Sequence, residues 1–363
     1  MSTNVLYLKY RPFQLQDVVG QQHVTKTLKQ ASIQNKFVHS YLFGGTKGCG
    51  KTTSSRILAN LLTCDNPQDG VLCRECEACK TIPHGKATDI IELDGAKNRK
   101  VEDINSLIEG AQWSPAVLKR KVLIIDEAHQ LSSTAISALL KIVEEPPEYL
   151  TFVFCTTEVN KIPNTILSRS QLFNFKKINF KHIASRLQYI SEQENINISE
   201  DALFDIAKLG RGSMRDAIGF LQQIETIAGG KRIESKSVQK YFGVTDRNAA
   251  FNIVKNMVQK NLSEVIDEIN DLFVSCADAQ GILYEISEIF RNIMILKAQK
   301  GNSKWVDLPE YEIERLQKIG ENLTFNQLDS LSQEFSTIKK ELEYSINERW
   351  VMESTLIKCM AKL

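Results

Sequence analysis

Residues 40–52 read SYLFGGTKGCGKT. The apolar run from Ser40 to Phe43 predicts a buried strand, and Gly45 to Thr52 match the pattern G-x-x-x-x-G-K-[ST], which leads from a strand into a helix. Glycines let the backbone N–H groups of such a loop curl around phosphates, and the helix N-terminus adds a favourable dipole. The residues expected to bind a nucleotide here are Gly45, Thr46, Lys47, Gly48, Cys49, Gly50, Lys51, Thr52 and Thr53.

A second apolar run, residues 122–125, ends in the adjacent carboxylates Asp126 and Glu127. In a P-loop protein we expect Lys51 to reach the β- and γ-phosphates, and the Thr52 hydroxyl and Asp126 to bind magnesium. Glu127 is expected to polarise the attacking water as a general base. Together the two segments predict a nucleotide hydrolase of the P-loop class.

Strands and helices alternate in the first half of the chain. Further apolar runs at residues 90–93 and 152–155 predict strands, and buried strands alternating with helices predict a parallel α/β sheet. Seven of the eight prolines lie at or before Pro163, so the chain beyond about residue 178 is expected to be mostly helical. We expect three domains: an α/β domain over 1–178, a small helical domain over 179–242 and a larger helical domain over 243–363.

Composition and charge are those of a globular protein with a sizeable core. The 363 residues carry 45 Lys+Arg against 44 Asp+Glu, so any binding of nucleic acid must use a local patch or an assembly. No apolar run approaches the ~20 residues that a membrane span needs. The N-terminus has no secretory signal, and a cytoplasmic location is expected.

Four of the eight cysteines, Cys64, Cys73, Cys76 and Cys79, crowd into sixteen residues. Four thiolates at this spacing predict a structural zinc site, and nearby basic residues would offset its negative charge. An iron–sulfur cluster is the alternative, since C-x2-C-x2-C begins the ferredoxin pattern. That pattern continues to a fourth Cys-Pro, which is missing here, so zinc is favoured.

Several motifs occur in the order that is typical of one known family. They are Tyr10-Arg11-Pro12, Asp17-Val18-Val19-Gly20-Gln21, the P-loop, the cysteine cluster, Asp126-Glu127-Ala128-His129, Glu144-Glu145-Pro146-Pro147 and Ile166-Leu167-Ser168-Arg169. The series resembles the gamma/tau subunits of bacterial DNA polymerase III, the motors of sliding-clamp loaders in the AAA+ ATPase class. The resemblance is dense from residue 1 to about 242 and weaker over 243–363. It implies an AAA+ α/β domain with an inserted zinc module (about 64–79), a helical lid domain and a helical collar domain.

The resemblance also implies roles for single residues. Thr157 matches the first sensor, with Thr156 barely separable from it, and Arg215 matches the second sensor. Arg169 matches the arginine finger that serves a neighbouring subunit; the family has Cys where this chain has Ser170, a change that preserves size. The segments lining the base pocket correspond to Arg11, Val18 and Val19.

The family implies a pentameric ring with delta and delta-prime subunits and further copies of this chain, which acts on the sliding clamp and primer–template DNA. ATP and magnesium would drive it, with zinc as a structural ion. In such a ring the candidates for DNA contact are Lys100 and Lys141, with Arg99 and Thr165 as weaker candidates facing the central channel. Contacts to phosphates would make binding depend on salt and be largely indifferent to sequence.

Two other functions remain open from the sequence. One is a non-hydrolysing scaffold of the clamp loader, which the intact Lys51, Thr52, Asp126 and Glu127 disfavour. The other is a helicase-type or Holliday-junction AAA+ motor. Residues 126–129 do spell the DEAH box of helicases, but no second helicase motif is apparent, and the cysteine insertion disfavours this class. We therefore expect His129 to begin a helix beside the site rather than to act in catalysis.

Overall fold

A computed structural model gives the fold of the chain and describes residues 5–81, 87–97, 101–242, 247–274, 279–300, 305–306, 308, 310–343 and 347–363. The chain divides into two compact units, residues 1–232 and 233–363. The helix at 235–242 belongs to the second of these units, whereas the last domain was expected to begin at residue 243. The three domain boundaries stay predictions.

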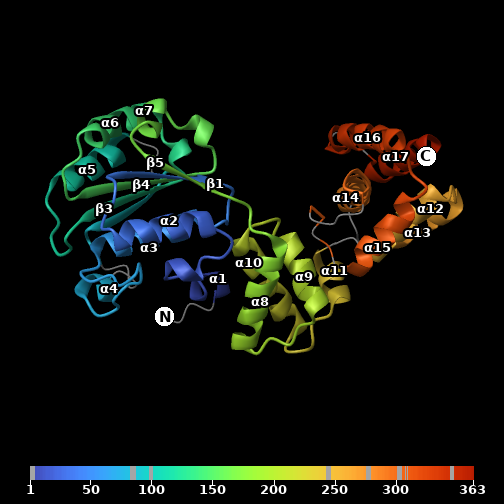
Figure 1. The fold of residues 1–363 in the computed structure, drawn as a ribbon, viewed down its shortest axis with the longest axis horizontal. Coiled ribbons are helices and arrows are strands. Elements are labelled where there is room, and N and C mark those ends of the chain that lie inside the picture. The colour runs from blue at the N-terminus through green and yellow to red at the C-terminus, as the bar shows by residue number, and fades with distance from the viewer. Residues whose placement is uncertain are drawn as a thin grey trace. The chain divides into compact units, whose positions relative to one another are not determined.

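The first unit is built on a five-stranded parallel sheet in the order β2-β3-β4-β1-β5 (Figure 1). Its strands are β1 (Ser40–Gly45), β2 (Ile90–Asp94), β3 (Lys121–Asp126), β4 (Leu150–Thr156) and β5 (Gln171–Phe175). Because parallel strands end at the same edge, the loops after β1, β3 and β4 lie side by side there. The expected parallel α/β sheet is confirmed.

Helices cover both faces of this sheet (Figure 1). One face carries α2 (Gln22–Ile33) and α3 (Lys51–Thr63), and the other carries α5 (Val101–Gln112), α6 (Ser133–Glu144) and α7 (Asn164–Leu167). Successive side chains of a strand point to opposite faces. Tyr41 and Phe43 therefore pack with α2 and α3, whereas Leu42 packs with α5 and α6. The short elements are α1 (Leu6–Lys9), η1 (Leu15–Asp17), α4 (Glu77–Thr81), η3 (Ala128–Gln130) and η4 (Val159–Lys161).

The edge strand β5 was not expected from the sequence. The four strands predicted from apolar runs are present, and each is mostly buried except β2. In β5 only Phe173 and Phe175 are buried. A half-exposed edge strand of five residues carries no continuous apolar run, so the signal that identifies buried parallel strands is missing.

Two buried charged side chains form hydrogen bonds with backbone groups of the segment that precedes β3. The Asp89 carboxylate accepts the backbone N–H groups of residues 116, 117 and 118 at 2.8–2.9 Å. Burial raises the pKa of Asp89, but these three donors and the nearby Lys121 ammonium outweigh it and hold the pKa below its usual value. Lys121 Nζ in turn donates to the carbonyls of Gly110 and Trp113, which end α5.

The lid domain follows the sheet and consists of α8 (Phe180–Glu194), α9 (Glu200–Leu209) and α10 (Met214–Ala228). Side-chain oxygens cap all three helices: Asn179 accepts from Lys181 N, Ser199 from Ala202 N, and Ser213 from Asp216 N. Gly229 ends α10 in the left-handed conformation, with φ 57°.

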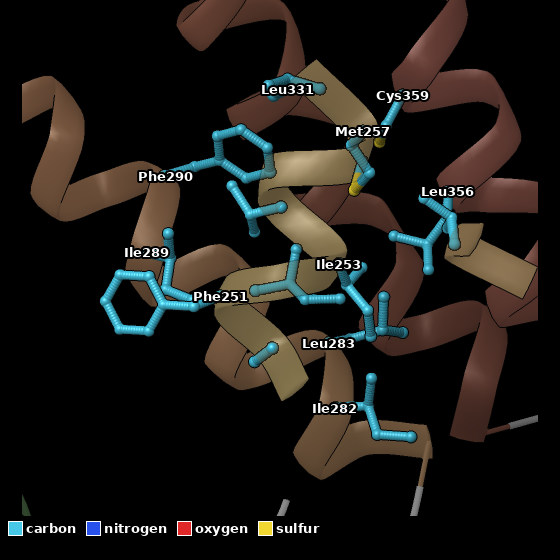
Figure 2. Close-up of a cluster of buried hydrophobic side chains, with 14 of the residues drawn as sticks. Phe251, Ile253, Met257, Ile282, Leu283, Ile289, Phe290, Leu331, Leu356 and Cys359 are labelled. Atoms are coloured by element: carbon cyan, nitrogen blue, oxygen red, sulfur yellow. The ribbon is translucent and has the colours of Figure 1, made fainter. Parts of the chain in front are cut away.

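All the regular elements described in the second unit are helices. Its helices are α11 (Ser235–Phe242), α12 (Arg247–Val258), α13 (Leu262–Val274), α14 (Ala279–Ala298), α15 (Glu310–Gly320), α16 (Phe325–Glu343) and α17 (Glu348–Lys362). Helix α14 has buried residues along its whole length, and its Leu283 and Phe290 pack with Met257 of α12 and Leu356 of α17 in one core (Figure 2). Within the described parts of both units, no helix is long and apolar enough to span a membrane.

Candidate active site

The glycine-rich loop joins β1 to α3 at the carboxyl edge of the sheet. Gly50 caps α3 in the left-handed conformation, with φ 103°. Lys51 is the first residue of the helix, is buried, and donates from Nζ to the carbonyls of Gly45 (2.7 Å) and Thr46 (2.9 Å). The loop is thus curled around its own lysine, with the backbone in the conformation that only glycine adopts freely.

The loop is also in close contact with the lid helix α10. A Cβ atom added to Gly48, whose φ is +72°, would meet Ser213 Oγ at 1.8 Å. The carbonyl of Gly48 accepts the backbone N–H of Met214 at 3.1 Å. The loop and the lid are therefore in contact at the backbone of Gly48, and only glycine fits at that position.

The carboxylates at the end of β3 lie beside the start of α3. Thr52 Oγ1 donates to Asp126 Oδ2 at 2.7 Å. Glu127 adopts the left-handed conformation (φ 49°, ψ 44°), and its own N–H is bound by Asp126 Oδ1 at 3.0 Å. A non-glycine residue rarely adopts this conformation, which turns the chain sharply after the strand and presents the Glu127 side chain at the edge of the sheet.

The residues after β4 approach Glu127 from the neighbouring strand. Thr157 Oγ1 lies 3.4 Å from Glu127 Oε2. Thr156 is fully buried, and its hydroxyl instead lies 3.1 Å from His129 Nδ1 and accepts the N–H of Glu158 at 3.0 Å. The geometry separates two threonines that the sequence barely separates, because consecutive side chains near the end of a strand point in different directions.

The N-terminal segment reaches the loop through Gln21, a fully buried residue. Its side-chain nitrogen donates to the carbonyls of Cys49 (3.2 Å) and Lys176 (2.7 Å), and its oxygen accepts Lys176 N at 3.1 Å. Val18 is buried, and its Cγ1 lies 3.8 Å from where a Cβ on Gly50 would be; Val19 is partly buried. The expected base-pocket segment thus adjoins the loop.

Arg11 and Arg215 form a basic group between this segment and the lid. Burial lowers the pKa of Arg11, and the nearby Arg56 and Arg215 lower it further. The Arg215 guanidinium lies over the Tyr7 ring, 4.8 Å from its centroid. A partly buried guanidinium at Arg11, with two further guanidinium groups near it, suits an anionic ligand.

Arg169 lies at the amino ends of the strands, whereas the glycine-rich loop lies at their carboxyl ends. Gln171 pairs with Tyr41 and Phe175 with Gly45, so Arg169 precedes the amino end of β5. Its guanidinium pairs with Glu144 at 2.8 Å and donates to the Thr165 carbonyl at 3.1 Å. Ser170 Oγ lies 2.7 Å from the buried Ser40 Oγ at the start of β1. One chain therefore does not bring Arg169 to its own loop.

The candidates for DNA binding are only partly described. Lys141 on α6 and Thr165 on α7 are exposed, and these two helices are in contact. Arg99 and Lys100 lie outside the described residues.

The four clustered cysteines converge after α3. All four Sγ atoms lie within 4.8 Å of one another, and the closest pairs are 3.5–4.0 Å apart. A tetrahedron of four thiolates at ~2.3 Å from zinc has sulfurs about 3.8 Å apart, so the thiols already have the right spacing. Hydrogen bonds from the backbone N–H groups of Cys76 and Glu75 lower the pKa of Cys73 to about 6, which favours the thiolate form that a metal needs.

Three residues at the site carry contacts that the sequence analysis did not assign: Gln21, Ser213 and His129. Gln21 stands in a quoted motif, which does not reveal its contact with the loop, and none of the motifs quoted above includes Ser213. His129 was expected only to begin a helix, and it does lie in η3. Its imidazole, however, also reaches Glu127, with Nδ1 3.5 Å from Oε2.

Comparison with known proteins gives matches along the chain. Residues 233–363 match the model of DNA polymerase III subunits gamma and tau domain III. Residues 182–231 match the DNA polymerase III clamp loader subunit ATPase lid domain, and residues 20–179 match the DNA polymerase III delta subunit model.

Similar whole proteins support the same relationship. The chain is 33% identical over 358 residues to DNA polymerase III subunit tau of Bacillus subtilis, covering 99% of this chain and 63% of that protein. It is 32% identical over 362 residues to the gamma subunit of Buchnera aphidicola subsp. Baizongia pistaciae, covering 99% and 97%. The chain spans about half the length of several tau and gamma/tau relatives that it matches. A RuvB structure from Thermotoga maritima is similar in fold, with a TM-score of 0.50, 21% identity, and 77% and 89% of the two chains covered.

Proposed function

Because the chain belongs to the gamma/tau family of DNA polymerase III clamp loader subunits, we propose that it is the ATP-driven motor of a clamp loader. It binds and hydrolyses ATP and thereby loads a sliding clamp onto primed DNA. The observation that carries this proposal is the convergence of the glycine-rich loop, Thr52, Asp126 and Glu127 at one edge of the sheet.

Each of these groups has a task in phosphoryl transfer. The loop amides and Lys51 hold the β- and γ-phosphates. Thr52 and Asp126 offer two oxygen donors 2.7 Å apart, the donor chemistry that magnesium prefers. Magnesium, when bound, neutralises charge on the phosphates. Glu127 accepts a proton from the attacking water, and Thr157 orients that water from the next strand.

The lid and a neighbouring subunit complete the site. Arg215 on α10 contacts the nucleotide from the lid, and Arg11 with Val18 and Val19 lines the base pocket. The Gly48–Ser213 contact supports this role, since it ties the lid to the phosphate loop. The position of Arg169 at the amino edge supports action in trans, because its own loop lies at the other edge.

The four cysteines bind one structural zinc. Their sulfur spacing and the absence of a fifth donor in the described cluster support a closed tetrahedral site that stabilises the inserted module.

The chain works in an assembly with delta and delta-prime subunits and further copies of itself. Its exposed Lys141 and Thr165, with Arg99 and Lys100, contact the phosphates of primer–template DNA. Such contacts make DNA binding sensitive to salt and largely indifferent to sequence.

The test is steady-state ATP hydrolysis by this chain combined with delta and delta-prime, with and without the sliding clamp and primed DNA. We expect strong stimulation only when clamp and DNA are both present. Lys51→Ala should abolish nucleotide binding, and Glu127→Gln should retain binding but stop turnover; Glu148→Gln, at an exposed position, is the matched control. Nucleotide binding without hydrolysis in the complete mixture would instead identify a scaffold subunit.

A further inference from the structure

The His129 imidazole is held between three groups from two strand ends. Its side chain is 8% exposed. Nδ1 lies 3.1 Å from Thr156 Oγ1 and 3.5 Å from Glu127 Oε2, while Nε2 lies 3.4 Å from Glu158 Oε1. The ring therefore spans from the carboxylate after β3 to the carboxylate after β4.

The partners on the β4 side are themselves fixed. Thr156 is fully buried and accepts the N–H of Glu158. Glu158 is paired with Lys161 of η4 at 2.9 Å. Because Thr156 is buried at the end of β4, its hydroxyl gives the imidazole an anchor that does not depend on Glu127, and the partly exposed Glu158 adds a second contact on the β4 side.

Glu127, in contrast, has few restraints. Its side chain is 28% exposed, and among the described residues its carboxylate has polar contacts within 3.5 Å to Thr157 and His129. Both distances are at the long end of hydrogen bonding. A carboxylate held by two long contacts depends on each of them for its position.

We propose that His129 is a positioning residue for Glu127, so that the imidazole, fixed by Thr156 and Glu158, sets where the Glu127 carboxylate lies. This inference rests on the proposed function, in which Glu127 is the general base. His129 makes no contact with the phosphate loop among the described interactions, so its loss affects turnover and leaves ATP affinity unchanged. A displacement of about 1 Å can cost roughly 10²-fold in rate.

Variants of His129 are expected to fold. The ring borders a surface hollow of about 510 Å³ that is also lined by Leu131, Ile136, Leu140 and Lys161. Removing the ring enlarges this hollow and leaves no sealed cavity in the core. Asn at this position places a polar atom near the Nδ1 position, whereas Gln places one near the Nε2 position. His129→Asn therefore keeps the contact toward Glu127, and His129→Gln keeps the contact toward Glu158.

The experiment uses the assembled complex with clamp and primed DNA. We expect His129→Ala to lower kcat by about 10–10²-fold and to change the ATP dissociation constant less than twofold. In a Glu127→Gln background, adding His129→Ala should cause no further loss in single-turnover rate, since residues that act as one unit are not additive. An unchanged kcat in His129→Ala, or a full additional loss in the double variant, would overturn the inference.

Asn and Gln variants keep the test decisive if His129→Ala does not fold. His129→Asn should retain more turnover than His129→Gln, because it preserves the contact with Glu127. Equal losses of turnover in the two variants would overturn the inference. Failure of the proposed function has a different signature. Normal turnover in Glu127→Gln alone would remove the general base, whereas slow Glu127→Gln with normal His129→Ala would remove only the positioning role.

Discussion

The contact between the phosphate loop and the lid predicts a large effect of Gly48→Ala. The left-handed φ of +72° strains any side chain, at about 1–2 kcal/mol. The new Cβ would also overlap Ser213 Oγ, at 1.8 Å, and such overpacking costs about 1–3 kcal/mol. The sum is about 2–5 kcal/mol against the arrangement in which loop and lid touch.

We expect this cost to appear in ATP binding, because in the proposed function the loop and Arg215 of the lid hold the same nucleotide. At 1.4 kcal/mol per tenfold, the lower value corresponds to about a 30-fold weaker affinity. Titration with a fluorescent ATP analogue measures it directly, and thermal unfolding shows whether the variant is folded.

A second substitution isolates the overlap. Ser213→Gly removes the clashing atoms and costs only a few tenths of a kcal/mol as a helix cap. In the Gly48→Ala background it should restore about 1–3 kcal/mol and leave the backbone strain. Gly219→Ala is the matched control: a Cβ there meets nothing within 4 Å, so ATP affinity should not change. Wild-type affinity in Gly48→Ala, or no recovery in the double variant, would refute the reasoning.

Three further predictions concern other parts of the chain. Arg169→Ala should leave hydrolysis by the isolated chain unchanged and slow the assembled complex by roughly 10³-fold or more, and a loss in the isolated chain would contradict action in trans. Metal analysis should find one zinc per chain, lost together with thermal stability in Cys73→Ser; full zinc content in that variant would remove Cys73 from the ligand set. Asp89→Asn should lower the free energy of unfolding by about 2–4 kcal/mol at pH 7, because three N–H donors lose a charged acceptor. The pKa of Asp89 is lower in the folded protein than in the unfolded chain, where it is about 4. The difference in free energy of unfolding between wild type and Asp89→Asn should therefore be complete above about pH 4 and shrink as the pH falls through the folded pKa. Urea unfolding measures this difference, and a difference that did not depend on pH would contradict this account.

Much of the fold follows from local patterns. Continuous apolar runs identify β1, β3 and β4 because these strands are buried on both faces, and N-cap residues such as Ser199 identify helix starts. The strand β5 was missed because alternate residues face solvent. The chain beyond about residue 178 was expected to be mostly helical, and the described elements from α8 to α17 are all helices.

The candidate site was predicted unevenly. The loop and the carboxylate pair carry their own spacing, so Lys51, Thr52, Asp126 and Glu127 could be named from the sequence. The contacts of His129 could not, because they join residues up to 29 positions apart through the packing of β3 beside β4. The same holds for Ser213, which meets Gly48 across 165 positions.

The candidate chemistry is readable in local motifs: a glycine-rich loop, two carboxylates after a strand, and four closely spaced cysteines. These motifs are short, and short motifs specify backbone geometry locally. Which groups meet depends on the tertiary structure. The parallel strand order places Arg169 at the edge opposite its own loop, and the pairing of β3 with β4 turns Thr157 toward Glu127 and Thr156 toward His129. Strand order and side-chain direction depend on how remote segments pack, and local spacing carries no information about that packing.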